Sequence, residues 1–355
     1  MSITTINMMP RVGFIFCFIA QFLLANANID ALFSEYDYPN VPGAGVAVIS
    51  DGKIIYERGY GLADIGLKIP STVYTNYRMA SLSKQFTAMA ILQLIDAGKL
   101  HFDDRLTELF PEYPSYGTAI RIRQLLGHLG GLNDYEDLIP SSQTKQLTDH
   151  DVFQLYLKHP SYMFSAGERY HYSNGGFVLL GLIVEKISGR NFEDYMKTEI
   201  FDRLGMVNSQ LMTDPRPMAH RAYGYTQQGE SFQKTDQSLT SGTRGDGCVY
   251  TSVHEWVYWE KALRESSLIK PELQQLAFTP GKLNNGSSTS YGFGWMLGTY
   301  QGLTRQYHTG STIGFRTAVE RIPAKKLAVV VFINRANASP SEKARRIVDM
   351  YAGAM

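Results

Sequence analysis

The stretch Ser81-Leu82-Ser83-Lys84 is one of five Ser-x-x-Lys patterns in this chain, and it is the one followed in order by two further motifs. These are Tyr172-Ser173-Asn174 and His308-Thr309-Gly310. The other two Tyr-x-Asn triplets, at Tyr38 and Tyr74, precede Ser81, and no second Lys/His-Thr-Gly triplet occurs. A single Ser-x-x-Lys carries little information, but the ordered set predicts one site assembled from three distant segments.

Ser81 and Lys84 are three residues apart, which in a helix places both side chains on one face. The polar run Thr75-Asn76-Tyr77-Arg78 predicts a loop that leads into this helix. A lysine whose pKa is lowered by burial can accept the proton of a serine hydroxyl, so Ser81 is a candidate nucleophile and Lys84 a candidate base. The simpler alternative is a helix cap followed by a surface lysine.

Tyr172 and Asn174 supply chemistry that complements this pair. A tyrosine phenol has an unperturbed pKa of about 10 and acts as a base only beside cations. As a phenolate Tyr172 could deprotonate Ser81, and as a phenol it could protonate a leaving group. The amide of Asn174 can hold both Lys84 and a substrate amide. The alternative is that Tyr172 and Asn174 only begin a helix, with Asn174 as its N-cap.

The third motif, His308-Thr309-Gly310, precedes a β-like run and has glycine where a backbone must come close to a ligand. A strand edge here can pair with an extended substrate, so His308, Thr309 and Gly310 are candidate substrate-positioning residues. The backbone N–H groups of Ser311 and Ser81 together would form an oxyanion hole. We expect His308 to line the site and tune Tyr172, although a lone histidine is more often structural.

The first 27 of the 355 residues form a segment of their own. Arg11 is its only charge, an apolar stretch runs from Val12 to Ala25, and Ala25-Asn26-Ala27 offers small residues for cleavage. This pattern predicts a secretory signal peptide at residues 1–27, and hence a periplasmic or secreted protein. The alternative is a membrane anchor, but fourteen residues interrupted by Gln21 fall short of the roughly 20 that span a bilayer.

Charge and cysteine content exclude several classes of function. Without Arg11 the mature chain has 33 basic and 33 acidic residues, so no electrostatic argument favours nucleic acid or an anionic membrane as a partner. Cys17 lies in the leader and Cys248 is the remaining cysteine, so we expect no internal disulfide. The eight histidines are scattered, which predicts no metal and no cofactor. The expected partner is a small-molecule or peptide substrate.

The periodicity predicts strands at both ends of the chain and helices between them. A hairpin turns at Asp51-Gly52, a second strand pair flanks residues 323–326, and a terminal helix begins near Ser339-Pro340. Helices are predicted at 81–97, 122–128, 174–187 and 192–204. The predicted fold class is α/β plus all-α: an antiparallel sheet from both chain ends, with an inserted mostly helical region. The single hydrolase domain spans 28–355, its α/β part about 28–85 and 246–355, its helical part about 86–245.

Five stretches carry a resemblance to a known superfamily: Tyr77-Arg78-Met79-Ala80-Ser81, the run from Arg123 to Leu132, Tyr172-Ser173-Asn174, Gly245-Asp246-Gly247-Cys248 and the His308 motif. Together they resemble the serine β-lactamase and penicillin-binding-protein-like superfamily. The branch is that of class C β-lactamases, D-alanyl-D-alanine carboxypeptidases, D-aminopeptidases and related esterases. The resemblance covers roughly Asp30 to Tyr351. It implies that Ser81 is acylated, that Lys84 and Tyr172 share acid/base work, and that Asn174 and His308 position the substrate.

Departures from the superfamily pattern bear on the substrate. Class C β-lactamases and most penicillin-binding proteins have lysine where this chain has His308, which would be mainly neutral at pH 7 and so weakens an antibiotic-resistance reading. The chain has His128-Leu129-Gly130-Gly131-Leu132 where His-Thr-Ser-Gly-Leu is common, and two hydroxyls are lost. Arg316 is a candidate replacement cation for a substrate carboxylate, or else a surface residue at a strand start.

The leading hypothesis is therefore an exported serine hydrolase that forms a Ser81 acyl-enzyme from an amide, lactam or ester. A D-amino-acid peptidase or carboxypeptidase-like activity is favoured, ester hydrolysis is the close alternative, and class C-like β-lactamase activity ranks third. A binding or sensor module of another class would trap acyl groups, as a penicillin-binding protein can, without turnover.

Overall fold

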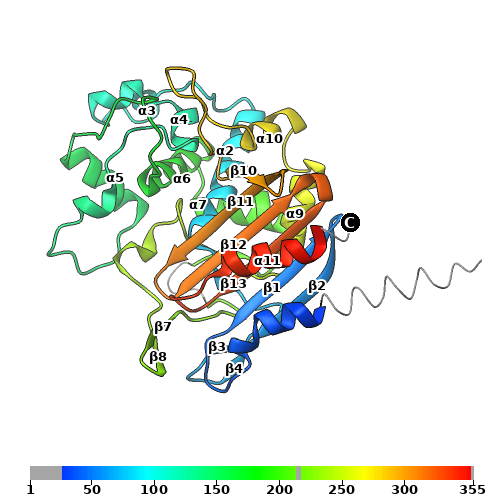
Figure 1. Cartoon of the computed structure of the whole chain (residues 1–355). Helices are drawn as coiled ribbons and strands as arrows, with labels where there is room; N and C mark the ends of the chain where they lie inside the picture. Colours follow the sequence, from blue (N-terminus) through cyan, green and yellow to red (C-terminus); the bar gives the residue numbers. More distant parts are fainter. Residues whose placement is uncertain (1–25, 213–216, 353–355) are drawn as a thin grey trace, which may run out of the picture.

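A six-stranded antiparallel sheet forms the centre of the protein (Figure 1). The computed structural model describes residues 26–212 and 217–352. Its strand order is β10-β11-β12-β13-β1-β2, so that both chain ends build one sheet, which confirms the predicted fold class. The strands are β1 Ala44–Ser50, β2 Lys53–Tyr60, β10 Met296–Tyr300, β11 Leu303–Thr312, β12 Phe315–Ile322 and β13 Leu327–Ile333.

The two ends of the chain meet in the pairing of β1 with β13. This ladder runs without interruption from Ala44 opposite Ile333 to Ser50 opposite Leu327. On its other side β1 turns into β2 at Asp51 and Gly52, whose φ angles of 49° and 74° are those of a two-residue hairpin. The predicted hairpin is therefore present, and it places β1 between β13 and β2 rather than at an edge of the sheet.

The sheet separates two hydrophobic cores. Alternate residues of β1 point to opposite faces: Val46 and Val48 pack with Ile347 of the C-terminal helix α11, whereas Ala47 and Ile49 join the larger core on the other side. Figure 1 shows α11 (Pro340–Ala352) lying across the sheet near β12 and β13. Residues 26–32 are helical and contribute Ile29 and Leu32 to the smaller core.

The larger core includes residues of the helices of the middle of the chain, and Figure 1 shows most of these helices to the upper left of the sheet, away from α11. Helix α6 ends at Gly189 and α8 at Gly205, two glycines in the left-handed conformation, as predicted from the sequence. These two helices and the others are α2 Lys84–Asp96, α3 Leu106–Leu109, α4 Ile122–Leu126, α5 Asp149–Lys158, α6 Asn174–Ser188, α7 Phe192–Met196, α8 Asp202–Leu204, α9 Trp256–Glu265 and α10 Pro271–Ala277.

Two predicted helices differ in detail from the observed ones. The helix expected at 192–204 is continuous but contains a π-helical turn at Lys197–Phe201. The helix expected from Ser81 begins as a 3₁₀ turn at Ala80–Ser83 and becomes α-helical at Lys84. Short strand pairs complete the fold: β3 Leu62–Asp64 with β4 Ile69–Pro70, β7 Tyr225–Gln228 with β8 Ser231–Lys234, and β9 Val249–Thr251 between β5 Tyr77–Arg78 and β6 Gln210–Leu211.

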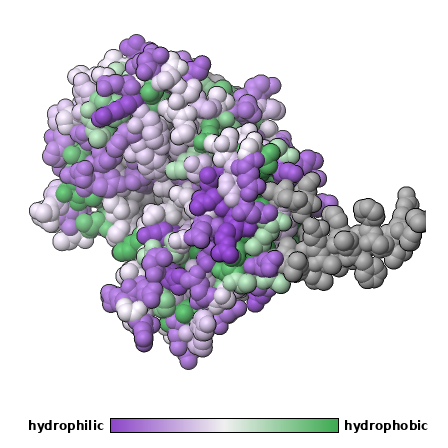
Figure 2. Space-filling view, in the orientation of Figure 1, coloured by the Kyte–Doolittle hydropathy of each residue, from purple (hydrophilic) through white to green (hydrophobic). Residues whose placement is uncertain are grey.

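The face of the molecule in Figure 2 is mostly polar. On the face in Figure 2 hydrophobic residues form small separate patches, and the most hydrophilic area lies over α11. Within the described ranges, no helix has both the length and the apolar character to cross a membrane. The predicted signal segment lies outside those ranges, except for Asn26 and Ala27 at the start of the first helical stretch. Cys248 is buried and unpaired, and burial raises the pKa of its thiol.

Candidate active site

Ser81 sits in a tight turn between a strand and a helix. The preceding residue, Ala80, has a φ of 48°, a left-handed conformation that costs free energy in any residue other than glycine. Backbone hydrogen bonds hold the turn: Met79 N donates to Val249 O at 2.8 Å, and Val249 N donates to Ser83 Oγ at 3.0 Å. These hydrogen bonds to strand β9 hold the strained backbone of the turn that carries the Ser81 hydroxyl.

Lys84 connects three of the segments singled out in the sequence. Its Nζ lies 3.3 Å from Ser81 Oγ, 2.8 Å from Asn174 Oδ1 and 2.8 Å from the backbone oxygen of Asp246. The side chain is fully buried. Burial lowers the pKa of Lys84 to about 8, although the charges of Asp246 and Glu136 oppose the shift. Neutral Lys84 can accept the Ser81 proton, and its pKa makes the neutral form accessible near physiological pH.

Tyr172 lies close to both Lys84 and Ser81, with Lys84 Nζ 5.0 Å from the centre of its ring. The hydroxyl oxygen is buried without a hydrogen bond of regular geometry in the described part of the chain. Burial raises the pKa of Tyr172 above its usual value, and the nearby Ser81 hydroxyl lowers it by less. Tyr172 is therefore a phenol at neutral pH. The sequence left two roles open for Tyr172, and its protonated state favours that of a proton donor over that of a base.

His128 holds Tyr172 in place. Its carbonyl accepts the backbone N–H of His171 at 3.0 Å, and its Nδ1 accepts that of Ser173 at 3.1 Å, one residue on either side of Tyr172. The two rings lie 4.2 Å apart. His128 has a φ of 59° and is buried, and burial keeps its pKa well below normal. From the sequence, the loop at His128 was notable only for its departure from the superfamily pattern, and no role was predicted for His128 itself.

Asn174 is the first residue of α6, but it is not the cap. The N-cap is Ser173, whose Oγ accepts the backbone N–H of Gly176 at 3.2 Å, which corrects the alternative that Asn174 caps the helix. The Asn174 side chain is thus free to reach the site. Its Nδ2 donates to Glu136 Oε1 at 2.7 Å, which turns Oδ1 toward Lys84.

Strand β11 approaches the nucleophile turn closely because Gly310 has no side chain. A Cβ at this position would lie 2.2 Å from Met79 O and 2.2 Å from Thr317 Oγ1. Thr317 Oγ1 itself donates to Met79 O at 2.9 Å. Ser81 and Ser311 line the same small cavity, as the expected oxyanion hole requires. The close approach of β11 to the Ser81 turn therefore requires glycine at position 310.

Strand β11 has an open edge near the site, as far as residues 26–212 and 217–352 show. Strand β10 pairs with residues from Leu303 to Tyr307 and no further, whereas β12 pairs with β11 as far as Thr312. Within the described ranges, the edge of His308–Thr312 on the β10 side is left without a ladder partner. An extended substrate can add to this edge, with Thr309 and Gly310 as its neighbours.

His308 is buried beneath this edge, and both of its ring nitrogens are engaged. Nδ1 lies 2.8 Å from Thr309 O and must donate to it, so in the neutral ring Nε2 accepts from the Tyr291 hydroxyl at 2.9 Å. Burial lowers the pKa of His308 to about 3. The imidazole is neutral at pH 7, as expected. Its ring lies 6.2 Å from that of Tyr172, so His308 packs behind the site.

Arg316 does not face the Ser81 cavity. One of its guanidinium nitrogens, Nη1, donates to Thr312 O and to Phe315 O, both at 2.7 Å, across the turn between β11 and β12. Arg316 lines a different groove, which lies between β11 and the start of α11. The geometry thus assigns it to the support of this turn. Arg316 therefore does not replace, at the Ser81 cavity, the lysine with which the third motif begins in class C β-lactamases.

Two residues of the site had no usable signal in the sequence. Glu136 orients Asn174 from a short 3₁₀ turn at Tyr135–Leu138, and belongs to no motif. Tyr291 is one of 22 tyrosines, and only its hydrogen bond to His308 distinguishes it. Both act through contacts between segments far apart in the chain, which no local pattern encodes.

The fold and the Ser81 site together define a serine hydrolase of the β-lactamase and penicillin-binding type. The model of the Beta-lactamase family matches residues 29–353, and the chain belongs to this family. A penicillin-binding protein of Bacillus subtilis (strain 168) is 30% identical over 333 residues, covering 89% of this chain and 73% of the relative. The resemblance predicted from the sequence is therefore confirmed.

Two further proteins are similar to this chain, one in sequence and one in fold. A D-aminopeptidase of Gluconobacter oxydans (strain 621H) is 28% identical over 305 residues, which is 84% of this chain but only 57% of that protein. A D-amino acid amidase from Ochrobactrum anthropi SV3 has the same fold: its structure matches with a TM-score of 0.80 at 22% identity, over 93% of this chain and 99% of the amidase.

We expect Gly310→Ala to lower kcat/KM about 100-fold, because the new methyl group would push β11 away from the Ser81 turn. The measurement is steady-state hydrolysis of a p-nitrophenyl ester, with circular dichroism to confirm folding. Gly298→Ala in β10 is the control, since the nearest atom to its Cβ would be 3.9 Å away. Unchanged kcat/KM in a folded Gly310→Ala protein would contradict the assigned approach of β11.

The low pKa of Lys84 predicts a pH dependence. If neutral Lys84 is the base, kcat/KM should rise about tenfold per pH unit below about pH 8 and level off above it, because the active form is the deprotonated one. The profile is measured from pH 6 to 10, with the Ser81→Ala rate subtracted. A flat profile, or one that falls through pH 8, would rule out Lys84 as this base.

Proposed function

We propose that the protein hydrolyses amide or ester bonds of D-amino-acid derivatives through a Ser81 acyl-enzyme. The observation that carries this proposal is the 3.3 Å contact between Ser81 Oγ and the Nζ of a buried lysine with a pKa of about 8. A serine beside such a lysine has both a nucleophilic oxygen and an acceptor for its proton. An ordinary surface lysine near a helix start would have neither the burial nor the three fixed contacts.

Acylation follows from the positions of the two groups around Ser81. Ser81 Oγ bonds to the substrate carbonyl carbon while its proton passes to neutral Lys84. The carbonyl oxygen becomes an oxyanion, which the backbone N–H groups of Ser81 and Ser311 would stabilise. Tyr172 donates its phenolic proton to the leaving nitrogen or oxygen as that bond breaks, and the proton on Lys84 replaces it. Water then attacks the acyl-enzyme and releases the acid.

The surroundings favour a peptide-like substrate. The open edge of β11 can bind an extended backbone, and the chain is similar to a D-aminopeptidase and to a penicillin-binding protein. Neutral His308 offers no fixed charge to the carboxylate of a β-lactam, which places β-lactamase activity behind peptidase activity. Ester hydrolysis uses the same acyl-enzyme and a better leaving group, and it remains the second candidate.

The test is turnover of three substrates by the mature protein: a p-nitrophenyl ester, nitrocefin and a D-alanyl-D-alanine peptide. We expect Ser81→Ala to lower any observed turnover by about a thousandfold or more, since it removes the nucleophile. Ser142→Ala is the matched control, because Ser142 begins another Ser-x-x-Lys pattern on an exposed loop. Stable labelling of Ser81 by a fluorescent β-lactam with no product from any substrate would instead support the non-turnover binding module.

We also propose that the protein is exported. Support comes from the apolar segment between Arg11 and Ala25 and from the small residues at Ala25 and Ala27. Expression of the full chain in a bacterial host should yield a periplasmic or secreted protein whose intact mass lacks residues 1–27. Recovery of the uncleaved chain in the cytoplasmic fraction would contradict export, and recovery of the uncleaved chain in membranes would favour a retained anchor.

A further inference from the structure

The small polar cavity beside Ser81, whose wall includes the two oxyanion-hole residues Ser81 and Ser311, also carries charged side chains that the acylation chemistry does not use. Its volume is about 80 Å3, enough for several groups of the size of a water molecule. The charged side chains on its wall are two carboxylates, Glu136 and Asp246, and one guanidinium, Arg78.

Asp246 is the most informative residue of this cavity. It is 7% exposed, and among the described residues its carboxylate makes no hydrogen bond or ion pair, with Oδ1 buried. Only its backbone oxygen has a partner, which is Lys84. A buried carboxylate without a partner is costly, because it has lost water and gained no donor in exchange. Its position on the cavity wall makes a bound cation the group that would compensate this cost.

Glu136 contributes a second negative charge to the same cavity. Its Oε1 accepts one hydrogen bond, from Asn174 Nδ2 at 2.7 Å. Burial raises the pKa of the Glu136 carboxyl, and the neighbouring charge of Asp246 raises it further. The two carboxylates therefore disfavour each other, and a positive charge between them would relieve both.

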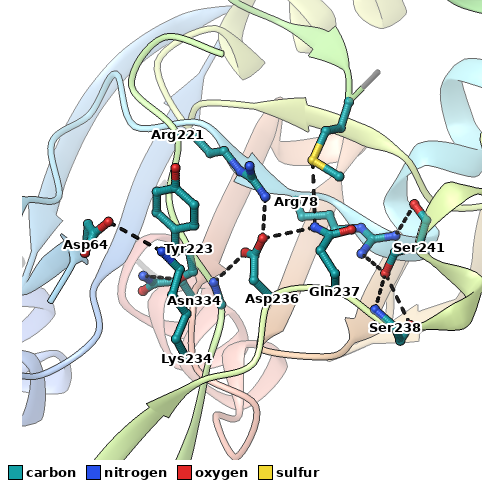
Figure 3. Close-up of polar contacts among 12 residues, drawn as sticks. Asp64, Arg78, Arg221, Tyr223, Lys234, Asp236, Gln237, Ser238, Ser241 and Asn334 are labelled. Carbon is teal, nitrogen blue, oxygen red and sulfur yellow. Dashed lines mark hydrogen bonds and ion pairs between the residues drawn. The ribbon is translucent and has the colours of Figure 1, made fainter. Parts of the chain in front are cut away.

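The two positively charged side chains near these carboxylates, Arg78 and Lys84, make their hydrogen bonds with other groups. Figure 3 shows Arg78 turned toward Ser241, to which Nη1 donates at 2.8 Å on Oγ and Nη2 at 3.3 Å on the backbone oxygen. Arg78 is buried and has no carboxylate partner in the described ranges. The three contacts of Lys84 Nζ are to a hydroxyl, an amide and a carbonyl. Neither cation neutralises Glu136 or Asp246 by direct pairing.

The loop that carries this wall is itself fixed. Figure 3 shows Asp236 bound by Arg221, and its Oδ1 accepts the backbone N–H of Gly224 at 2.8 Å. Ser238 N donates to Ser241 Oγ at 2.9 Å, beside the Arg78 contact. The cavity wall near Arg78 is therefore preformed, and a ligand would not have to order it first.

We propose that the cavity binds a primary ammonium group on the acyl part of the substrate, with Asp246 and Glu136 as its acceptors. The protein would then act on residues with a free amino group, at the amino end of a peptide or in an amino acid amide or ester, rather than on N-acylated residues. In an α-aminoacyl group the nitrogen is two bonds from the carbonyl carbon that Ser81 attacks, so both fit at one site. This inference rests on the proposed acyl-enzyme function.

The test compares D-alanine p-nitroanilide with its N-acetyl derivative, and p-nitrophenyl propionate with both. In the unaltered protein we expect kcat/KM for the free amine to exceed that for the N-acetyl form by roughly tenfold or more. Asp246→Asn and Glu136→Gln should each reduce this ratio toward one, with a smaller loss on the propionate ester. Asp137→Asn is the matched control, since Asp137 is exposed in the same 3₁₀ turn and does not line the cavity.

A second measurement does not depend on the variants folding. In the unaltered protein, n-propylammonium should inhibit propionate ester turnover at a concentration at least tenfold lower than n-propanol does. Equal inhibition by the two compounds, preference for the N-acetyl substrate, or equal losses on amine and ester substrates in the variants would each overturn the ammonium subsite. Failure of the function itself looks different: no substrate, including the propionate ester, would show Ser81-dependent turnover, and the subsite would fall with it.

Discussion

The position of Lys84 Nζ is the constraint on which the rest of the site depends. Three segments meet at this one atom: the nucleophile turn through Ser81, the start of α6 through Asn174, and the loop before β9 through Asp246. A buried ammonium is costly unless such acceptors surround it, and here two of the three are uncharged dipoles and one is the nucleophile itself. The same burial that makes the lysine costly makes it a usable base near neutral pH.

The sheet brings the fourth segment to this point. Because β13 pairs along all of β1, the C-terminal strands are anchored to the first strand of the chain, and β12 carries β11 to the Ser81 turn. Gly310 allows the backbones of β11 and the Ser81 turn to come close, and the side-chain hydroxyl of Thr317 donates to Met79 O beside it. Strain at Ala80 and close packing at Gly310 occur next to each other, and both serve the placement of one hydroxyl.

Aromatic and histidine side chains form a second layer behind the reacting groups. His128 supports Tyr172, and Tyr291 supports His308, with ring centres 4.2 and 5.7 Å apart in the two pairs. Both histidines are neutral because burial lowers their pKa values. In this protein the third motif therefore contributes shape and a strand edge, and the charge near Ser81 comes from Lys84, Asp246, Glu136 and Arg78.

Much of the fold and of the candidate site could be predicted from the sequence, because the features concerned are local ones. The hairpin at Asp51-Gly52, the glycine-terminated helices and the three ordered motifs each depend on residues close together in the chain. The sequence alone therefore determined the fold class, and it supplied the candidate site residues Ser81, Lys84, Tyr172, Asn174 and His308. What only the tertiary structure decided are the protonation states, the partners and the unmatched carboxylate of Asp246. Burial and the contacts of Glu136 and Tyr291 arise between distant segments, and a linear pattern contains no measure of either.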